Sequence, residues 1–320
     1  MRISDNHIMV RPTLIVGLGG TGTLVCQWLE EFMRNVLGVV PPFIRFLKLD
    51  TDALEEGGPP NAGRADFINL FQHLDIGAVV RDCARYPDFH PHLDWFKPLG
   101  DKLDAVFADY GCQGLPRLGR LVFAELRESV IHQAVSTRFS ELRAASQIDM
   151  KGDMEQFEII PGGAPAVHIA ASVCGGTGAG LLIDMAYNLR WWSREAFPRS
   201  AEVVGHLMLP EAFMIDPMLR PKLRAVAAAT LEQIEFLSDP RRDDIPVRYQ
   251  GGAEQCFDRL TAPFNFLYLV NGQGDLGVGN RKHLVKMVAQ VIQSMTLEPA
   301  SKLVASESNN KLADALGLYD

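Results

Sequence analysis

The chain has 320 residues, 47% of them hydrophobic, and carries a formal net charge of −8 at pH 7. This length and apolar content are enough for one large domain or two ordinary ones with a well-packed core. Positive and negative charges are mixed along the chain, which argues against a nucleic-acid partner and against a dedicated surface for anionic membranes.

Cysteine usage and the apolar runs bear on where the protein works. The five cysteines, Cys26, Cys83, Cys112, Cys174 and Cys256, are scattered without Cys-x-x-Cys spacing. The sequence shows no apolar run of membrane-spanning length and no basic-then-apolar signal segment at its N-terminus. These features predict a cytoplasmic protein that does not insert into a membrane.

Strands and helices are expected to alternate from the start of the chain. Residues 13–17 predict a buried strand, and the apolar residues after it recur at helical spacing until Pro41 and Pro42 end the helix. Residues 43–50 predict a second strand with an acidic end. The turn-rich residues 54–103 are interpreted as an insertion over one edge of the sheet.

The same alternation continues to the end of the chain, with a second insertion at 238–262. The remaining expected elements are a strand at 104–110, a long helix to about 145, a strand at 166–172, a helix after 180, a strand at 202–209, a helix from Pro221, a strand at 264–270 and a helix at 281–298. This order predicts a three-layer, Rossmann-like α/β fold with a mainly parallel sheet flanked by helices. In such sheets ligands bind at the carboxyl ends of the strands.

Two glycine-rich stretches each lie between an expected strand and an expected helix. They are GLGGTGT at 17–23 and VCGGTGAG at 173–180. Free backbone N–H groups at a helix N-terminus carry partial positive charge, and glycine lets a phosphate approach them. Tight packing of helix on strand explains one such loop, but two in one chain favour a phosphate ligand. A bulky residue at Gly20 or Gly176 is then expected to block nucleotide binding and leave the fold largely intact.

A dinucleotide site is one alternative for the first loop. Neither loop contains the Gly-Lys-Ser/Thr of a Walker A P-loop. Gly17, Gly19 and Gly22 satisfy Gly-x-Gly-x-x-Gly, with Asp50 as the ribose acid, and ATP-using adenylating enzymes have a similar loop. However, Asp50 lies 28 residues after Gly22, beyond the usual spacing of ~20. Either enzyme type also leaves the second loop without a role.

The second loop resembles the glycine-rich signature Gly-Gly-Gly-Thr-Gly-Ser/Thr-Gly of the tubulin/FtsZ superfamily, with Cys174 in place of the first glycine. Other stretches resemble that superfamily in the same chain order. They are VGLGGTGT, LDTDAL, GCQGLPRLGR (with Gly111, Gly114, Gly119 and Arg120 in register), LMLPEAF and YLVNGQ. The chain is most similar to divergent bacterial tubulin-like proteins, and the resemblance covers roughly residues 13–300.

The resemblance implies a site for GTP or GDP with Mg²⁺. The residues that it places around the phosphates are Gly19, Gly20, Thr21, Gly22, Gly111, Gly114, Gly175, Gly176, Thr177 and Gly178. Thr51 and Asp52 would lie near the Mg²⁺ ion, with Asp52 as the metal ligand. Glu211 would accept from ribose hydroxyls, and Asn271 would match a guanine edge because its amide both donates and accepts.

The C-terminal end departs from the superfamily pattern. The acidic catalytic loop, Asn-x-Asp-x-x-Asp, can be laid against residues 308–316, where Asn309 matches, Lys311 replaces the first acid and Asp314 takes the second position. Asp314 is therefore the candidate catalytic residue; an ordinary capped helix is the alternative. Residues 1–280 are expected to form the GTP-binding domain, and 281–320 the central helix and the start of a missing or reduced C-terminal domain.

The function implied by the resemblance is that of a slow GTPase which self-associates head to tail into cytoskeletal polymers. The alternatives are the dinucleotide- or ATP-using enzyme described above and a nucleotide-binding scaffold without hydrolysis. The resemblance implies self-association as the partner interaction, and it leaves other proteins open as further partners.

Three further features have simpler interpretations. His90 and His92, with Asp94, have the spacing of a metal site, but a solvated loop is the more usual explanation. His168 and His206 fall inside strands and are expected to be satisfied in the core. Cys174, at a helix start, suits a low-pKa thiol, although packing is the preferred interpretation.

Overall fold

A computed structural model describes residues 8–52, 58–59, 66–86, 88, 90–96, 112, 114–147, 155, 157–160, 162–213, 216–252, 254–272 and 281–297. The strand expected at 104–110, Gly111 and the loop at 308–316 lie outside these residues. In the part that is described, no helix is long and apolar enough to cross a membrane.

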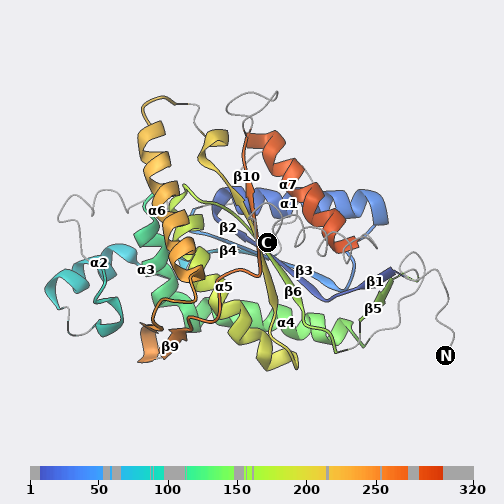
Figure 1. Cartoon of the computed structure of the whole chain (residues 1–320), viewed down its shortest axis with the longest axis horizontal. Helices are drawn as coiled ribbons and strands as arrows, with labels where there is room; N and C mark the ends of the chain where they lie inside the picture. The colour runs from blue at the N-terminus through green and yellow to red at the C-terminus, as the bar shows by residue number, and fades with distance from the viewer. Residues whose placement is uncertain are drawn as a thin grey trace, which may run out of the picture.

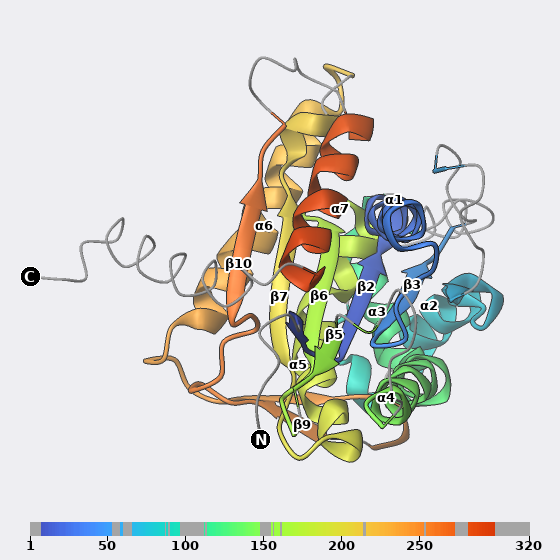
Figure 2. The same ribbon diagram turned by 90° about the vertical axis from the view of Figure 1, so that its right-hand side faces the viewer.

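A six-stranded parallel sheet forms the centre of the molecule (Figure 2). Its strands, in order across the sheet, are β10 (Phe266–Val270), β7 (Glu202–Met208), β6 (Ala166–Ser172), β2 (Thr13–Leu18), β3 (Ile44–Asp50) and β4 (Phe67–Asn69). All neighbouring pairs run parallel. β2 and β6 are buried along their whole length, which explains why both read as continuous apolar runs.

Helices cover both faces of the sheet (Figures 1 and 2). One face carries α1 (Gly19–Leu37) and α7 (Arg281–Leu297), which pack on each other. The other carries α3 (Pro116–Leu126), α4 (Gln133–Ala145), α5 (Gly176–Ala196) and, outside them, α6 (Arg220–Ser238). An apolar core lies on each side of the sheet, and successive side chains of β2 point alternately into the two. Leu14 and Val16 pack on the α5 side and Ile15 on the α1 side. This confirms the expected three-layer α/β fold.

Smaller elements extend the central unit. They are the parallel pair β1 (Ile8–Val10) and β5 (Phe157–Ile159), the antiparallel pair β8 (Ile245–Arg248) and β9 (Glu254–Phe257), helix α2 (Ile76–Arg85), a π-helical stretch at Arg127–His132, and 3₁₀ turns at Leu70–Gln72 (η1), Pro91–Leu93 (η3), Pro210–Phe213 (η7) and Gln250–Gly252 (η8). The π-helical stretch joins α3 to α4, so the long helix expected to end near 145 is a continuous but irregular one.

The structure corrects two expectations about the first hundred residues. The segment 54–103 is not wholly an insertion, because β4 adds to the sheet beside β3. β4 has three half-buried residues, too few to show a period in the sequence. The first helix ends at Gly38 and not at Pro41: Gly38 has φ 74°, and its N–H bonds the carbonyl of Arg34.

Residues 238–262 are packed onto the domain through a buried arginine. Arg242 is 6% exposed and donates to the carbonyls of Leu237 and Phe257 at 3.2 and 2.7 Å. It also reaches the hydroxyl of Tyr187 on α5 at 3.1 Å, and the ring of Tyr187 stacks on Phe257 at 4.0 Å. Because these partners come from three segments, the β8–β9 pair is held against α5.

His168 on β6 and His206 on β7 are buried and bonded to each other, Nδ1 to Nε2, at 2.9 Å. Burial lowers the pKa of His168 to about 4 and also lowers the pKa of His206. Both imidazoles are therefore neutral at physiological pH, which confirms that they are satisfied core residues.

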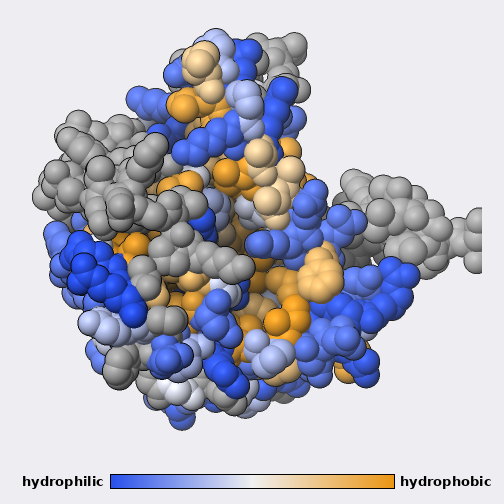
Figure 3. Space-filling model, turned by 90° about the vertical axis from the view of Figure 1, so that its left-hand side faces the viewer, coloured by the Kyte–Doolittle hydropathy of each residue, from blue (hydrophilic) through white to orange (hydrophobic). Residues whose placement is uncertain are grey.

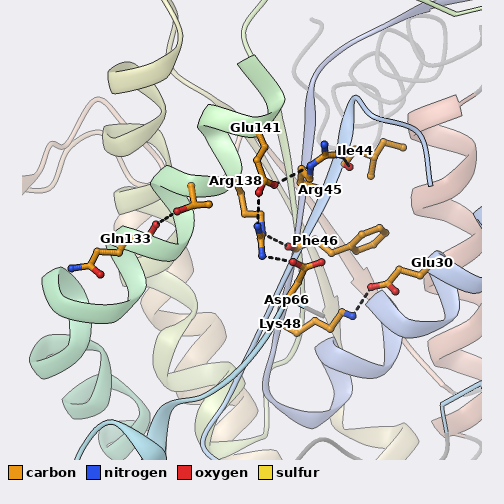
Figure 4. Close-up of polar contacts among 10 residues, drawn as sticks. Glu30, Ile44, Arg45, Phe46, Lys48, Asp66, Gln133, Arg138 and Glu141 are labelled. Carbon is orange, nitrogen blue, oxygen red and sulfur yellow. Dashed lines mark hydrogen bonds and ion pairs between the residues drawn. The ribbon is translucent and has the colours of Figure 1, made fainter. Parts of the chain in front are cut away.

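Polar side chains also tie β3 to the helices on both of its sides (Figure 4). On the α4 side, Arg138 donates to the carbonyl of Phe46 at 3.2 Å and pairs with Asp66. On the opposite side, Lys48 points at Glu30 of α1 and forms an ion pair with it. The Lys48 side chain is completely buried, so this pair lies inside the α1 core and away from water.

Candidate functional site

The predicted site residues gather at one edge of the sheet because every strand of the sheet points the same way. Each group directly follows the carboxyl end of a different strand: Gly19–Gly22 follow β2, Thr51 and Asp52 follow β3, Gly175–Gly178 follow β6, Glu211 follows β7 and Asn271 follows β10. Such an edge is the usual ligand site of a parallel α/β sheet. Five segments far apart in the sequence thereby meet there.

The glycine loops are in direct contact with one another. A Cβ on Gly19, which has φ +68°, would lie 3.0 Å from the N atom of Gly178. A Cβ on Gly176 would lie 2.7 to 2.8 Å from atoms of Cys112 and from the N atom of Gly114. The loops after β2 and β6 and the loop before α3 therefore form one cluster.

Close packing accounts for several of these glycines. A Cβ on Gly22 would lie 2.1 Å from the carbonyl oxygen of Ala170, and one on Gly180 would lie 2.2 Å from that of Pro116. A bulky residue at Gly176 would likewise meet protein backbone and not a phosphate. The expectation that Gly176 can be replaced with the fold intact is therefore wrong.

Gly175 differs from its neighbours because a Cβ there would meet nothing within 4 Å. It is the N-cap of α5 with φ −85° and ψ 158°, a conformation open to any residue, and no side chain caps the helix. α1 also begins without a side-chain cap at Leu18. Two neighbouring helix N-termini without side-chain caps, with open space at Gly175, make a cradle for an anion.

Hydroxyl groups beneath the cradle bond to one another. Thr51 Oγ1 lies 2.6 Å from Thr177 Oγ1 and accepts the N–H of Cys112 at 3.1 Å. Asp50, 4% exposed, accepts the N–H of Thr51 at 2.7 Å. Burial raises the pKa of the Asp50 carboxyl to about 6. The carboxyl therefore begins to take up a proton as the pH falls from 7 toward 6.

The residues expected at the metal fit a Mg²⁺ ion shared with phosphates. Asp52, the second residue after β3, is exposed, and Thr51 next to it is buried. Mg²⁺ prefers oxygen ligands and is commonly held by one or two carboxylates together with phosphate oxygens and water. One exposed carboxylate beside the anion cradle is consistent with that mode of binding.

The sugar and base side of the site is built on the ends of β7 and β10. These strands are in register through Met208 and Val270, and a Cβ on Gly272 would lie 3.0 Å from the side chain of Ala212. Glu211 and Asn271 therefore extend from adjacent segments. Glu211 Oε2 is buried and has no hydrogen-bond partner, as expected for an acceptor that needs a ligand hydroxyl.

Two cations at the site were not predicted from the sequence. Arg281, the first residue of α7, donates from Nη2 to Thr21 Oγ1 at 3.2 Å, and its guanidinium lies 5.7 Å from the ring of Phe213. Lys222 of α6 comes close to Gly114, at 3.4 Å from the position of a Cβ there. Both residues lie in the first turn of a helix, where the helix dipole disfavours a positive charge. That unusual position is the only feature of the sequence that could have pointed to them.

Cys174 in the second glycine loop is a packing residue. It is 3% exposed, its sulfur lies 3.0 Å from Ser172 Oγ, and burial raises the pKa of its thiol. A raised pKa is the opposite of what a reactive thiolate needs, which supports the packing interpretation. Two further predicted residues, Gly111 and Asp314, lie outside the described residues.

A separate hollow lies on the α3, α5 and α6 side of the domain. The cavity has a volume of about 350 Å³, and its lining includes Trp95, Arg120, Asp184, Phe236 and Ile245. Seen from the left-hand side of Figure 1, the molecular surface has a central depression with apolar side chains in it and polar ones around it (Figure 3). Arg120 lies over the ring of Trp95 at 4.7 Å and pairs with Asp184 at 3.3 Å.

Comparison with known proteins finds one matching family model and several solved structures of low sequence identity. The family model described as tubulin like matches residues 14–318. No curated protein gives a significant match. Similar solved structures include a GTPγS-bound protofilament of CetZ2 from Haloferax volcanii, at 14% identity over 90% of this chain and 58% of that one, with a TM-score of 0.45.

Two further structures are similar at the same level. CetZ from Methanosaeta thermophila strain DSM 6194 has 13% identity over 91% of this chain and 56% of that one, with a TM-score of 0.46. A GTPγS-form protofilament of TubZ from Bacillus thuringiensis serovar israelensis has 14% identity over 91% and 57%, with a TM-score of 0.46. This chain thus spans less than two thirds of the length of these three proteins. Since the family model covers nearly its whole length, the chain belongs to the tubulin-like family.

Proposed function

We propose that this chain is a cytoplasmic GTP-binding protein that associates head to tail with itself and hydrolyses GTP slowly. The observation that carries the proposal is the anion cradle in front of Gly175, between the uncapped N-termini of α1 and α5. Membership of the tubulin-like family supports the choice of a guanine nucleotide. Residues 1–280 form the nucleotide domain in this proposal, and 281–320 begin with the central helix α7, which packs on α1.

Each part of the nucleotide has a group suited to it. The amides of the two glycine loops face the phosphates, and a Mg²⁺ ion held by Asp52 would offset their negative charge. Glu211 accepts from the ribose through its buried Oε2. Asn271 is exposed beside it, at the end of β10. Arg281 holds the hydroxyl of Thr21 at the start of α1.

The burial of Asp50 argues against a dinucleotide site. A ribose-binding acid must present its carboxylate to the ligand. Asp50 is 4% exposed, and one of its oxygens already accepts the N–H of Thr51. A dinucleotide site requires an accessible acid at the end of the second strand. Asp50 is the acid at that position, and it is not accessible.

Binding of guanine over adenine nucleotides tests the base assignment. Titration with fluorescent GDP and ADP is expected to give tighter binding of GDP, and Asn271→Ala should reduce that preference by about tenfold or more, because a site built to hydrogen-bond one base then loses its partner. Affinity for inorganic triphosphate should stay unchanged in the same variant. Tighter binding of ADP or NAD by the wild type would instead support a dinucleotide- or ATP-using enzyme.

Dependence of turnover on protein concentration tests the assembly proposal. If the acidic loop of one subunit completes the site of the next, the GTPase rate per subunit should rise with concentration. Asp314→Ala should lower that rate by about 10²–10⁴, the usual contribution of a positioned acid–base group. Turnover that is fast, independent of concentration and unaffected by the substitution would contradict the mechanism. Binding without turnover at any concentration would favour the non-hydrolysing scaffold.

A further inference from the structure

Two histidines and a glutamate form a compact cluster away from the nucleotide edge. His90 and His92 flank Pro91 at η3, and Glu125 lies on α3. One nitrogen of each ring and one carboxylate oxygen all lie within 4.8 Å of one another. Among the described residues, this is the only group of three or more metal-ligating side chains gathered in this way.

The surroundings of the cluster keep these groups in place. Glu125 is 3% exposed and His92 is 9% exposed, whereas His90 is half-buried and opens the cluster toward solvent. His92 Nε2 donates to Glu125 Oε1 at 2.5 Å. The backbone carbonyl of His92 accepts the indole N–H of Trp95 at 3.0 Å, which fixes the turn. Asp94, the acid nearest in sequence, is exposed and does not belong to the cluster.

We propose that His90, His92 and Glu125 bind a divalent transition-metal ion, with Zn²⁺ as the best match. Two imidazole nitrogens and one carboxylate oxygen are a common set of protein ligands for Zn²⁺, with water in the fourth position. Ligand atoms around tetrahedral Zn²⁺ lie about 3.3 Å apart. The His92–Glu125 pair at 2.5 Å therefore opens by under about 1 Å when the ion takes the place of the His92 N–H proton, which leaves to solvent. His90 approaches the ion from the side that is open to solvent.

The ion would connect the 90–96 segment to helix α3. That segment already touches α3 through Trp95, whose ring lies under the guanidinium of Arg120. α3 begins at Pro116, directly after the loop that carries Gly114. A metal at Glu125 therefore stabilises the helix that follows one of the candidate phosphate loops. The site itself shares no residue with the nucleotide site.

The test is Zn²⁺ binding by the full chain after chelator treatment, without nucleotide. Isothermal titration with ZnCl₂ is expected to give one ion per chain in the wild type, and Zn²⁺ should raise the melting temperature. His92→Gln and Glu125→Gln should each weaken binding by about 100-fold, as expected for a lost ligand. His90→Ala should do the same, and because His90 is half-buried, this variant keeps the test valid if the buried substitutions impair folding.

Matched variants separate this site from other sources of Zn²⁺ binding. Asp94→Asn should leave the affinity unchanged, since Asp94 is outside the cluster, and Asp52→Asn should do so because it affects only the nucleotide edge. Cys83→Ser should also be neutral; Cys83 is buried near Glu125 but its sulfur is not among the clustered atoms. The proposal is wrong if wild type binds no more Zn²⁺ than the folded His90→Ala variant. It is equally wrong if Asp94→Asn or Asp52→Asn abolishes binding.

Discussion

Replacing Gly175 by valine is expected to lower nucleotide affinity by about 100-fold or more while the protein stays folded. Gly175 has backbone angles that valine adopts readily, and no atom lies within 4 Å of the added Cβ. The side chain would instead occupy the space in front of the helix N-terminus. Loss of two charge-assisted hydrogen bonds to phosphate, at about 1.5–3 kcal/mol each, gives this factor. Titration with fluorescent GDP measures the affinity, and circular dichroism monitors the fold.

Gly180→Val is the contrasting variant in the same loop and helix. Its Cβ would lie 2.2 Å from the carbonyl oxygen of Pro116 and 2.7 Å from Cα of Gly119, so α3 and α5 could not approach as they do. This variant should lower the melting temperature strongly, whereas Gly175→Val should change it little. Unchanged nucleotide binding by folded Gly175→Val would show that the open space at Gly175 is not where phosphate binds.

Removing the carboxylate of the buried ion pair is expected to destabilise the fold by about 3–5 kcal/mol, the usual cost of breaking such a pair. Lys48 is completely buried on β3, and Glu30 on α1 is 4% exposed. Glu30→Leu leaves the buried ammonium without this carboxylate. Lys48→Met should cost less, because Glu30 keeps Arg34 as a partner at 3.2 Å. Urea unfolding of both variants measures the difference.

The double variant Glu30→Leu/Lys48→Met is the control for that experiment. With both charges replaced by apolar groups of similar size, neither is left buried alone, so stability should recover most of the loss. No recovery in the double variant would show that the pair does not act as a unit, and equal costs for the two single substitutions would show that Arg34 does not compensate Glu30 for the loss of Lys48. Nucleotide binding by folded variants should be unaffected, because the pair lies inside the α1 core.

Much of the fold was predictable because long elements leave a strong pattern in the sequence. β2, β3, β6, β7 and β10 were all expected within two residues, and so were the start of α6 and both ends of α7, whereas the end of α1 and the start of α5 were not. Buried parallel strands appear as continuous apolar runs, and amphipathic helices repeat every 3.6 residues. The short strands β1, β4, β5, β8 and β9 were missed, since three or four residues contain too little pattern to be distinguished from a loop.

The sequence by itself also determined which residues follow the strand ends, and hence that the glycine loops, Asp52, Glu211 and Asn271 belong to one edge of a parallel sheet. Only the tertiary structure decided what each glycine does. Gly175 and Gly176 are neighbours in one motif, yet one faces open space and the other the backbone at Cys112. That difference depends on how α3 packs against α5. Likewise, Glu125 joins His90 and His92 only because α3 passes beside η3, a contact between distant segments that no local pattern contains.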